Sequence, residues 1–418
     1  MVTKNNLPKI SFAHHINNSN ARNAALALSE NGLLHKAITT VAYQPDSSFG
    51  KLLQKLPAKI SQPLQKELSR RIWTEVDVTT YPLQEIVRIF LARTKLTSVF
   101  GLENADLTDW VYRELDKQIA QSHLEGIGGI YLYEDLAATT FEKAKEKGIL
   151  CFYDLPIPYY KIKDRVMIEE RSRFPHLSYE IDDLKPEKLK RKQREVELAD
   201  HIFVASSITK RSLLEIGVNE KKITVIPYGA PTQTFKPLPK KDDIFRVVYV
   251  GRISTRKGIH YLIPAWQQLK LKKAELCLIG GNLFPSGWLE QYRDICRHVP
   301  SVPHVLLNEY YSQGSVLVFP SLMEGFGLVI LEAMACGIPV ITTPNTGGLD
   351  IIDDGIDGFI VPIRDVEALK ERIQWCYDHP DELAQMGIMA RKKAEQLTWG
   401  VYRQRLADKV KELLMMKK

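Results

Sequence analysis

The chain has 418 residues, of which 44% are hydrophobic and 26% charged, and its formal net charge is +7. This length and composition predict two or three globular domains and exclude collagen-like, disordered and membrane-embedded chains. The sequence has no apolar run of about eighteen residues and no apolar segment of signal-peptide length near its start. We therefore expect a cytoplasmic protein whose contact with membranes is at most peripheral.

Cysteine usage and charge spacing exclude further classes of function. The cysteines are odd in number, widely separated and set mostly in apolar segments, which predicts reduced core thiols at Cys151, Cys277, Cys296, Cys336 and Cys376. The sequence has no CxxC, no HExxH and no clustered histidines, so we expect no metal site. The basic residues form no stripe with interleaved aromatics, so we expect no nucleic-acid binding.

The first half of the chain alternates short β-rich runs with helical patterns. A strand is expected over 9–13, a polar loop over HHINNSN, and a helix over 21–30 that Asn18 or Ser19 caps. Further strands are expected over 37–43, 129–133, 149–154, 201–205 and 222–227. This alternation predicts an α/β fold with a doubly wound, mostly parallel sheet.

The densest basic stretch, KPEKLKRKQREVELAD at residues 185–200, has the apolar spacing of an amphipathic helix. Its cations form either a solvated helix face or a docking surface for acidic lipid headgroups.

A proline-rich polar segment, APTQTFKPLPKKDD, separates the two halves of the chain. It predicts a boundary between a domain at residues 1–236 and another at 237–398. In the second half, strands are expected over 245–250, 275–279, 315–319, 338–342 and 358–361. The second domain is therefore expected to be doubly wound as well.

The residues with chemical potential concentrate in this second half. The strand FRVVYV runs into Gly251-Arg252 and the loop STRKG, which places Arg252 and Lys257 at the carboxyl end of a strand and ahead of a helix. A guanidinium and an ammonium beside a helix N-terminus suit a diphosphate. The alternative is an ordinary βα turn with surface cations.

A second strand–loop–helix segment, residues 320–339, contains two glutamates. Glu324 lies in the loop, where Gly325 and Gly327 let backbone amides approach a ligand. Glu332 lies in an apolar helix, where a buried carboxylate needs donors such as a ribose diol. The alternatives are a helix cap for Glu324 and a core-arginine partner for Glu332. A glycosidase pair is disfavoured, because eight helical residues rise about 12 Å.

Together these motifs resemble the retaining glycosyltransferase family 4. The resemblance covers most of residues 224–400 and rests on the GR-x4-KG turn, the E-x7-E pair within EGFGLVILEAMACGIPVI, and the segments TTPNTGG and DGIDGFIV. YEDLA, FYDLPIPYY and LADHIFVASSITKRSL in the first half are similar more loosely. The resemblance implies the GT-B architecture, in which two Rossmann-like domains face each other across a cleft and a C-terminal helix, here 399–418, crosses back to the first domain.

The resemblance also implies a role for each motif residue. Arg252 and Lys257 would hold the donor diphosphate, and Glu332 the ribose. The donor sugar would be held by Glu324, the expected catalytic residue, and by Gly325, Phe326, Gly327 and Leu328. Such enzymes need no divalent metal, and the chain contains no Asp-x-Asp, so no cofactor is expected. Retention is explained by same-face attack assisted by the departing phosphate, without a protein nucleophile.

The acceptor side departs from the family pattern. The first loop reads AHHINNSNAR in place of paired glycines, which leaves His14 and His15 as acceptor-side candidates or as solvated loop residues. FYDLPIP lacks a histidine that is frequent in the family, which leaves Tyr153 and Asp154 as acceptor-side candidates or as core residues.

The donor side departs from it too. Residues 281–315 are expected to lack an extra strand, so the nucleobase pocket would be built differently. UDP is the default nucleotide, with GDP and ADP open. The aromatic segment NLFPSGW and the exposed-looking pair Tyr310-Tyr311 would either stack on a ligand or belong to the core.

The sequence thus predicts a retaining glycosyltransferase that moves a sugar from a nucleotide-sugar to a glycan or lipid-linked acceptor in cell-surface polysaccharide or glycolipid synthesis. Two alternatives stay open. One is a nucleotide-sugar epimerase on the same architecture, and the other is a non-catalytic GT-B subunit that supports a partner transferase.

Overall fold

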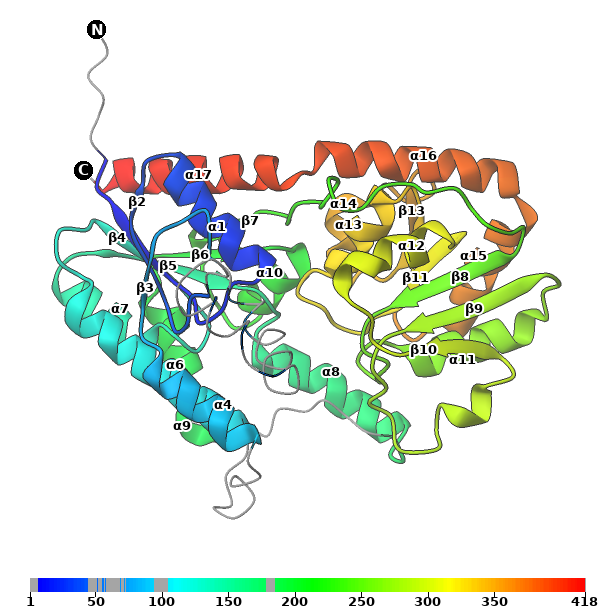
Figure 1. Ribbon diagram of the computed structural model, residues 1–418, viewed down its shortest axis with the longest axis horizontal. Coiled ribbons are helices and arrows are strands. Elements are labelled where there is room, and N and C mark those ends of the chain that lie inside the picture. The colour runs from blue at the N-terminus through cyan, green and yellow to red at the C-terminus, as the bar shows by residue number, and fades with distance from the viewer. Residues whose placement is uncertain are drawn as a thin grey trace, which may run out of the picture.

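The computed structural model describes residues 7–43, 73–93, 104–177 and 185–417, together with positions 51, 55, 57, 68 and 71. Two parallel sheets lie side by side in the molecule, each flanked by helices (Figure 1). The predicted α/β class with two doubly wound units is therefore confirmed.

The first sheet is built from strands of the first half of the chain, in the order β3-β2-β1-β4-β5-β6-β7. Its strands are β1 (Ile10–Ala13), β2 (Leu34–Thr39), β3 (Val78–Thr80), β4 (Gly129–Tyr133), β5 (Leu150–Leu155), β6 (His201–Val204) and β7 (Ile223–Val225). Its helices are α1 (Ser19–Glu30), α4 (Leu83–Arg93), α6 (Asn104–Ser122), α7 (Ala138–Glu146), α8 (Tyr160–Arg173), α9 (Pro186–Leu198) and α10 (Ser207–Leu214). The strand order reverses between β1 and β4, so the ligand crevice of this sheet is expected at their carboxyl ends.

The second sheet has the order β10-β9-β8-β11-β12-β13 and reverses between β8 and β11. Its strands are β8 (Phe245–Val250), β9 (Ala274–Ile279), β10 (Cys296–Val299), β11 (Val316–Phe319), β12 (Val340–Thr342) and β13 (Gly358–Ile360). The helices are α11 (Ile259–Leu269), the short η4 (His304–Leu306), α12 (Leu307–Ser312), α13 (Leu328–Ala335), α14 (Gly348–Ile351), α15 (Val366–Asp378), α16 (Pro380–Gln396) and α17 (Trp399–Met416).

Most strand positions match the sequence-based prediction, but two strands were missed. The expectation that residues 281–315 lack an extra strand was wrong, because β10 pairs in parallel with β9 at the edge of the sheet. Its central residues Arg297 and His298 are exposed. Because only one side of an edge strand is paired, its sequence need not alternate apolar and polar residues. The three-residue β3 gave no pattern for the same reason.

The core lies between the helices and the buried strands of each sheet. All five cysteines are buried and unpaired, as predicted. Burial raises the pKa of Cys336 and of Cys376 to about 12, so both stay neutral thiols. They act as small core residues.

The C-terminal helix joins the two halves. α16 and α17 follow one another along the top of the molecule, and α17 lies against α1 of the first domain (Figure 1). Arg403 on α17 bonds to Glu30 at 2.8 Å and to Asn23 at 2.9 Å. Residues after the second domain are therefore anchored on the first.

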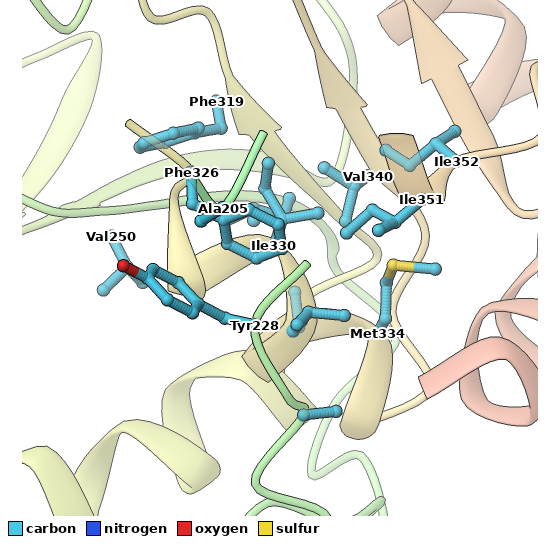
Figure 2. Packing of buried hydrophobic residues seen from close by; sticks show 14 of the residues in the cluster. Ala205, Tyr228, Val250, Phe319, Phe326, Ile330, Met334, Val340, Ile351 and Ile352 are labelled. Atoms are coloured by element: carbon cyan, nitrogen blue, oxygen red, sulfur yellow. The ribbon is translucent and has the colours of Figure 1, made fainter. Parts of the chain in front are cut away.

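A shared apolar contact also connects the halves. Tyr228, in the segment that follows β7, packs its ring 5.3 Å from that of Phe326 and 5.8 Å from that of Trp399. Figure 2 shows Tyr228 and Phe326 within the same cluster of buried hydrophobic residues. The connection is thus a packed junction.

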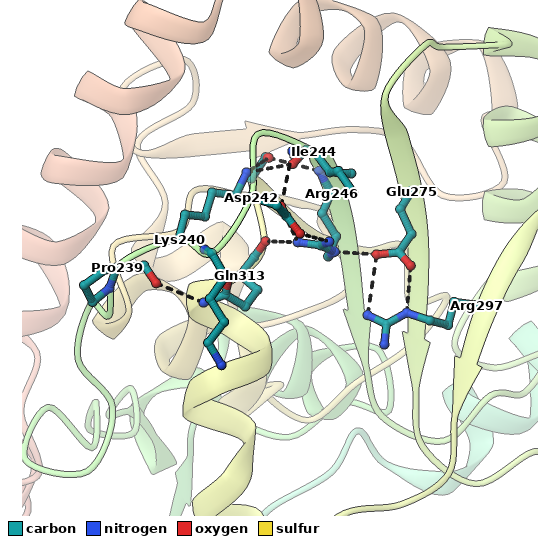
Figure 3. Close-up of polar contacts among 10 residues, drawn as sticks. Pro239, Lys240, Asp242, Ile244, Arg246, Glu275, Arg297 and Gln313 are labelled. Atoms are coloured by element: carbon teal, nitrogen blue, oxygen red, sulfur yellow. Dashed lines mark hydrogen bonds and ion pairs between the residues drawn. The ribbon is translucent and has the colours of Figure 1, made fainter.

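The amino ends of the second-domain strands are held by a polar network (Figure 3). The buried Arg246 at the start of β8 pairs with Asp242 at 2.9 Å, with Glu275 on β9, and with the carbonyl of Gln313 at 2.7 Å. Arg297 on β10 bonds to Glu275 at 2.7 Å. This network braces the end of the sheet that is opposite to the predicted donor site.

The basic stretch at 185–200 forms α9, and part of its charge faces inward. Lys192 is buried and pairs with Glu134 at 2.7 Å and with Asp135 at 3.1 Å. Arg191 bonds to Asp109 and Arg194 to Glu142. A purely solvated face is therefore wrong, because these cations neutralise carboxylates of the same domain. None of the helices that the structure describes is long and apolar enough to cross a membrane.

Candidate functional site

The predicted donor residues meet at the reversal point of the second sheet. The loop after β8, residues 251–258, and the loop after β11, residues 320–327, leave neighbouring strands at their carboxyl ends. A crevice at such a point is the usual ligand site of an open parallel sheet. The sequence placed Arg252, Lys257 and Glu324 correctly at this edge.

Glu324 lies between two cations. Lys257 Nζ is 2.5 Å from Oε1 of Glu324, and Arg256 donates Nη1 both to the same oxygen and to the carbonyl of Met323. Burial acts to raise the pKa of Glu324, but Lys257 and Arg256 outweigh it and hold that pKa below its usual value. The carboxylate is therefore ionised and is an acceptor for sugar hydroxyls. A helix-cap role is wrong, because Gly327 occupies the N-cap of α13.

Arg256 is a site residue that the sequence analysis missed. It directly precedes Lys257, and no motif marks it. Its side chain is mostly buried and reaches the same carboxylate oxygen as Lys257. Glu324 is thus held by two cations, of which the sequence analysis identified only Lys257.

Arg252 and Lys257 differ in exposure. Arg252 is exposed, and its backbone carbonyl accepts a hydrogen bond of 2.6 Å from the hydroxyl of Tyr249. Lys257 is buried, with Nζ 4.8 Å from the centre of the Phe319 ring. The loop is fixed by these two neighbours, while the Arg252 side chain faces solvent at the crevice.

The glycines after Glu324 serve close packing. A Cβ atom on Gly325 would lie 1.9 Å from the carbonyl oxygen of Pro156, which belongs to the first domain. Gly327 has a φ of 89°, which favours glycine, and starts α13. The Phe326 side chain is buried in the core, so only its backbone can reach a ligand. The first amides of α13, from Leu328 on, have no acceptor within the helix.

Glu332 is covered by two donors. Its carboxylate accepts hydrogen bonds from His304 Nε2 and from the Tyr311 hydroxyl, each at 2.8 Å. The predicted alternative of a core-arginine partner is wrong, because the carboxylate is bonded to the imidazole of His304 and the phenol of Tyr311. Tyr311, expected to be exposed, is fully buried. The carboxylate faces the segment after β10, at the crevice end of the sheet.

The first domain touches the donor loop directly. Ser206 and Thr209, at the start of α10, donate their hydroxyls to the carbonyl of Gly325. The amide of Ser207 donates to the carboxylate of Asp350 at 2.9 Å. Together with the contact to Pro156, these bonds fix the Glu324 loop against the opposite domain.

A second interdomain contact centres on Glu170, on α8. This fully buried carboxylate accepts hydrogen bonds from His260, Tyr261 and Arg364 of the second domain, each at 2.7 Å. Burial alone would raise the pKa of Glu170, but these donors hold it below its usual value. Figure 1 shows α8 reaching towards the second sheet, on the side opposite to α16 and α17.

His14 and His15 lie at the carboxyl end of β1, at the reversal point of the first sheet. His14 is buried against Tyr133, with ring centres 4.5 Å apart, and burial lowers its pKa to about 4. His15 Nε2 lies 2.9 Å from the Tyr112 hydroxyl, and burial followed by the charges of His14 and Arg71 lowers its pKa well below the usual value. The solvated-loop interpretation is wrong, and both rings are neutral at pH 7.

Tyr153 and Asp154 are buried. The Tyr153 hydroxyl donates to Glu195 at 3.0 Å, and Tyr131 donates to Asp154 at 2.6 Å. Burial raises the pKa of Asp154 to about 7. This placement favours the core role that the sequence left open for both residues.

At this edge two cations, Lys257 and Arg256, share the single carboxylate of Glu324, so positive charge is in excess. Among the residues that the structure describes, no three His, Cys, Asp or Glu side chains are grouped so that they could hold a metal ion.

The family model described as glycosyl transferases group 1 matches residues 231–393. The matched residues make up about two fifths of the chain and are similar to that family. The matched range contains the loop after β8 and the E-x7-E pair, and thus includes Arg252, Lys257, Glu324 and Glu332.

Curated relatives are similar to this chain over about half of its length. A D-inositol 3-phosphate glycosyltransferase of Kineococcus radiotolerans is 27% identical over 264 residues, which are 53% of this chain and 60% of the relative. The capsular polysaccharide biosynthesis glycosyltransferase CapM of Staphylococcus aureus is 30% identical over 226 residues, which are 48% of this chain and 59% of the relative. The matched region spans less than two thirds of either relative.

The fold extends the similarity to nearly the entire chain. Anabaena Alr3699/HepE, solved in complex with UDP, superposes with a TM-score of 0.63 and 16% identity, covering 97% of this chain and all of that one (100%). The chain therefore has the GT-B architecture that the sequence motifs implied.

Proposed function

We propose that the protein is a retaining glycosyltransferase that transfers a sugar from a nucleotide-sugar, with UDP as the nucleotide, to a glycan or lipid-linked acceptor in cell-surface polysaccharide or glycolipid synthesis. The observation behind this proposal is the cluster of Glu324, Lys257 and Arg256 at the carboxyl edge of the second sheet, beside the N-termini of α11 and α13. The HepE structure in complex with UDP and the capsule-synthesis role in the name of CapM support the choice of donor and acceptor class.

The donor diphosphate would bind between the two loops of the crevice. Lys257 and the exposed Arg252 supply positive charge, and the N-terminus of α11 follows the same loop. Positive groups fixed before the reaction stabilise the charge that develops on a departing nucleoside diphosphate. These cations would neutralise the diphosphate without a divalent metal.

The donor sugar would bind beside the second loop. Glu324 is ionised, so it accepts hydrogen bonds from sugar hydroxyls and favours a positively polarised ring near it. Lys257 contacts Glu324 in the structure and would turn to the diphosphate when the donor enters. Arg256 would then keep Glu324 in position.

Transfer with retention would need no protein nucleophile. The acceptor hydroxyl would attack the anomeric carbon from the face that the diphosphate leaves, and its proton would pass to the departing phosphate. The acceptor would approach from the first domain, whose crevice at β1 and β4 carries His14 and His15. Because both imidazoles are neutral at pH 7, they would orient hydroxyls by hydrogen bonding.

The proposal is tested by incubating the protein with UDP-glucose, UDP-galactose and UDP-N-acetylglucosamine in the presence of a bacterial membrane glycolipid extract. We expect acceptor-dependent release of UDP with one donor, and a product whose anomeric configuration by proton NMR equals that of the donor. The control variant is His379→Ala, at the end of α15 on the opposite side of the domain, and its release of UDP should equal that of the wild-type protein. Inversion of configuration, or sugar release without an acceptor requirement, would contradict the proposal.

A further inference from the structure

The contact between His304 and Glu332 blocks the place where the donor ribose would bind. The Glu332 side chain is 7% exposed, whereas that of His304 is 62% exposed. The two are joined by a hydrogen bond of 2.8 Å between Nε2 and Oε1. A ligand hydroxyl that approaches the carboxylate from solvent therefore meets the imidazole first.

The second donor to Glu332, Tyr311, cannot move away from the carboxylate into solvent. Tyr311 is fully buried on α12, and its hydroxyl lies 2.8 Å from Oε2 of Glu332. Its ring packs 5.7 Å from that of Phe235. Of the two donors, only His304 can rotate into solvent without opening the core.

The strength of the hydrogen bond from His304 to Glu332 depends on whether the imidazole is protonated. Among the described residues, His304 bonds to the Glu332 carboxylate on α13, which also accepts from the Tyr311 phenol on α12, and its ring lies 5.1 Å from the uncharged Phe235 ring in the interdomain segment. The Cys336 thiol, one turn after Glu332, has its pKa raised to about 12 and stays neutral. The hydrogen bond between His304 and Glu332 raises the pKa of His304 above its usual value. An imidazolium holds a carboxylate more tightly than a neutral imidazole does.

We infer that His304 is a gate on the ribose site: it occupies Glu332 when the donor is absent, must leave before the ribose diol can bind, and makes nucleotide affinity fall as the pH falls. This inference rests on the proposed donor site. It assigns to this chain a residue that lowers affinity for the nucleoside part of the donor and leaves the diphosphate contacts untouched.

The test compares binding of UDP and of inorganic pyrophosphate, which has no ribose, by isothermal titration calorimetry between about pH 5.5 and pH 8.5. Replacing the exposed His304 by alanine should tighten UDP binding by about tenfold at the acid end and by about threefold at the alkaline end, because a charged hydrogen bond is stronger than a neutral one. Pyrophosphate binding should be the same in both proteins. His304→Gln keeps a neutral donor, so its affinity relative to that of His304→Ala should not vary with pH.

The ratio of the UDP affinities of the wild-type protein and His304→Ala at each pH cancels the effect of titration of UDP itself. Equal or weaker UDP binding by His304→Ala at every pH would overturn the gate, provided that UDP binds the wild-type protein and is lost in Arg252→Ala/Lys257→Ala. The absence of UDP binding in all variants would overturn the proposed donor site and the gate together. Unchanged melting temperatures of the two His304 variants show that the fold is intact.

Discussion

Replacing Glu324 by glutamine should separate nucleotide binding from sugar transfer. In the structure the carboxylate pairs with both Lys257 and Arg256, and Lys257 is one of the two cations proposed to hold the diphosphate. Glutamine keeps the shape of the side chain and removes its charge. Lys257 then becomes available to phosphate without first breaking an ion pair.

The size of the effect follows from the geometry. Lys257 and Glu324 are 11% and 14% exposed, so their contact of 2.5 Å is partly shielded from water. A hydrogen bond between charged partners at such a site contributes about 1.5 to 3 kcal/mol. Loss of the competing charge should therefore tighten UDP binding by roughly tenfold, which corresponds to about 1.4 kcal/mol.

Transfer should change in the opposite direction. Without the carboxylate, the donor sugar loses an ionised acceptor for its hydroxyls, and kcat should fall by about a hundredfold, a usual loss for a charged group that acts in the transition state. Calorimetry with UDP and an assay of UDP release measure the two effects on the same protein. Weaker UDP binding together with unchanged transfer would refute this account of Glu324.

Three further outcomes are expected. Burial raises the pKa of Asp154 to about 7 in the folded state, so the folded protein binds a proton there that the unfolded chain releases above its ordinary pKa of 3.8, and stability should fall as the pH rises between these values. Asp154→Asn should flatten the dependence of the melting temperature on pH over this range. An unchanged slope would count against the burial argument. Glu170→Ala leaves three donors of the second domain without their acceptor. It should therefore lower the melting temperature and increase the radius of gyration measured by small-angle scattering. The same change at the neighbouring, half-exposed Glu169 should alter neither quantity. Addition of EDTA should leave transfer unchanged, and loss of activity that Mg²⁺ or Mn²⁺ restores would show that a metal takes part.

The sequence was most informative where a pattern is local. β4 and β8 have the bounds that were predicted for them, because each is a buried apolar run between turn residues. The position of Arg252, Lys257 and Glu324 at one edge was predictable because each follows a recognisable strand, and the carboxyl ends of neighbouring parallel strands meet there. The edge strand β10 was missed because its exposed residues carry no such pattern.

Contacts between distant segments could not be predicted. His304 and Tyr311 reach Glu332 through the packing of η4 and α12 on α13, and no motif connects them. Gly325 was expected to make room for a ligand, but in the structure it makes room for Pro156 of the other domain. Both features depend on tertiary and interdomain packing, which a single sequence does not encode in any short spacing.

The central claim is that the crevice at Arg252 and Lys257 binds a nucleoside diphosphate. A thermal-shift panel of UDP, GDP and ADP with their common sugar conjugates, run on the wild-type protein and on Arg252→Ala/Lys257→Ala, tests it most directly, because a ligand that binds only the folded state raises the melting temperature. The account predicts a shift with UDP and UDP-sugars that disappears in the double variant. A shift that survives in the double variant, or no shift with any nucleotide, would contradict it.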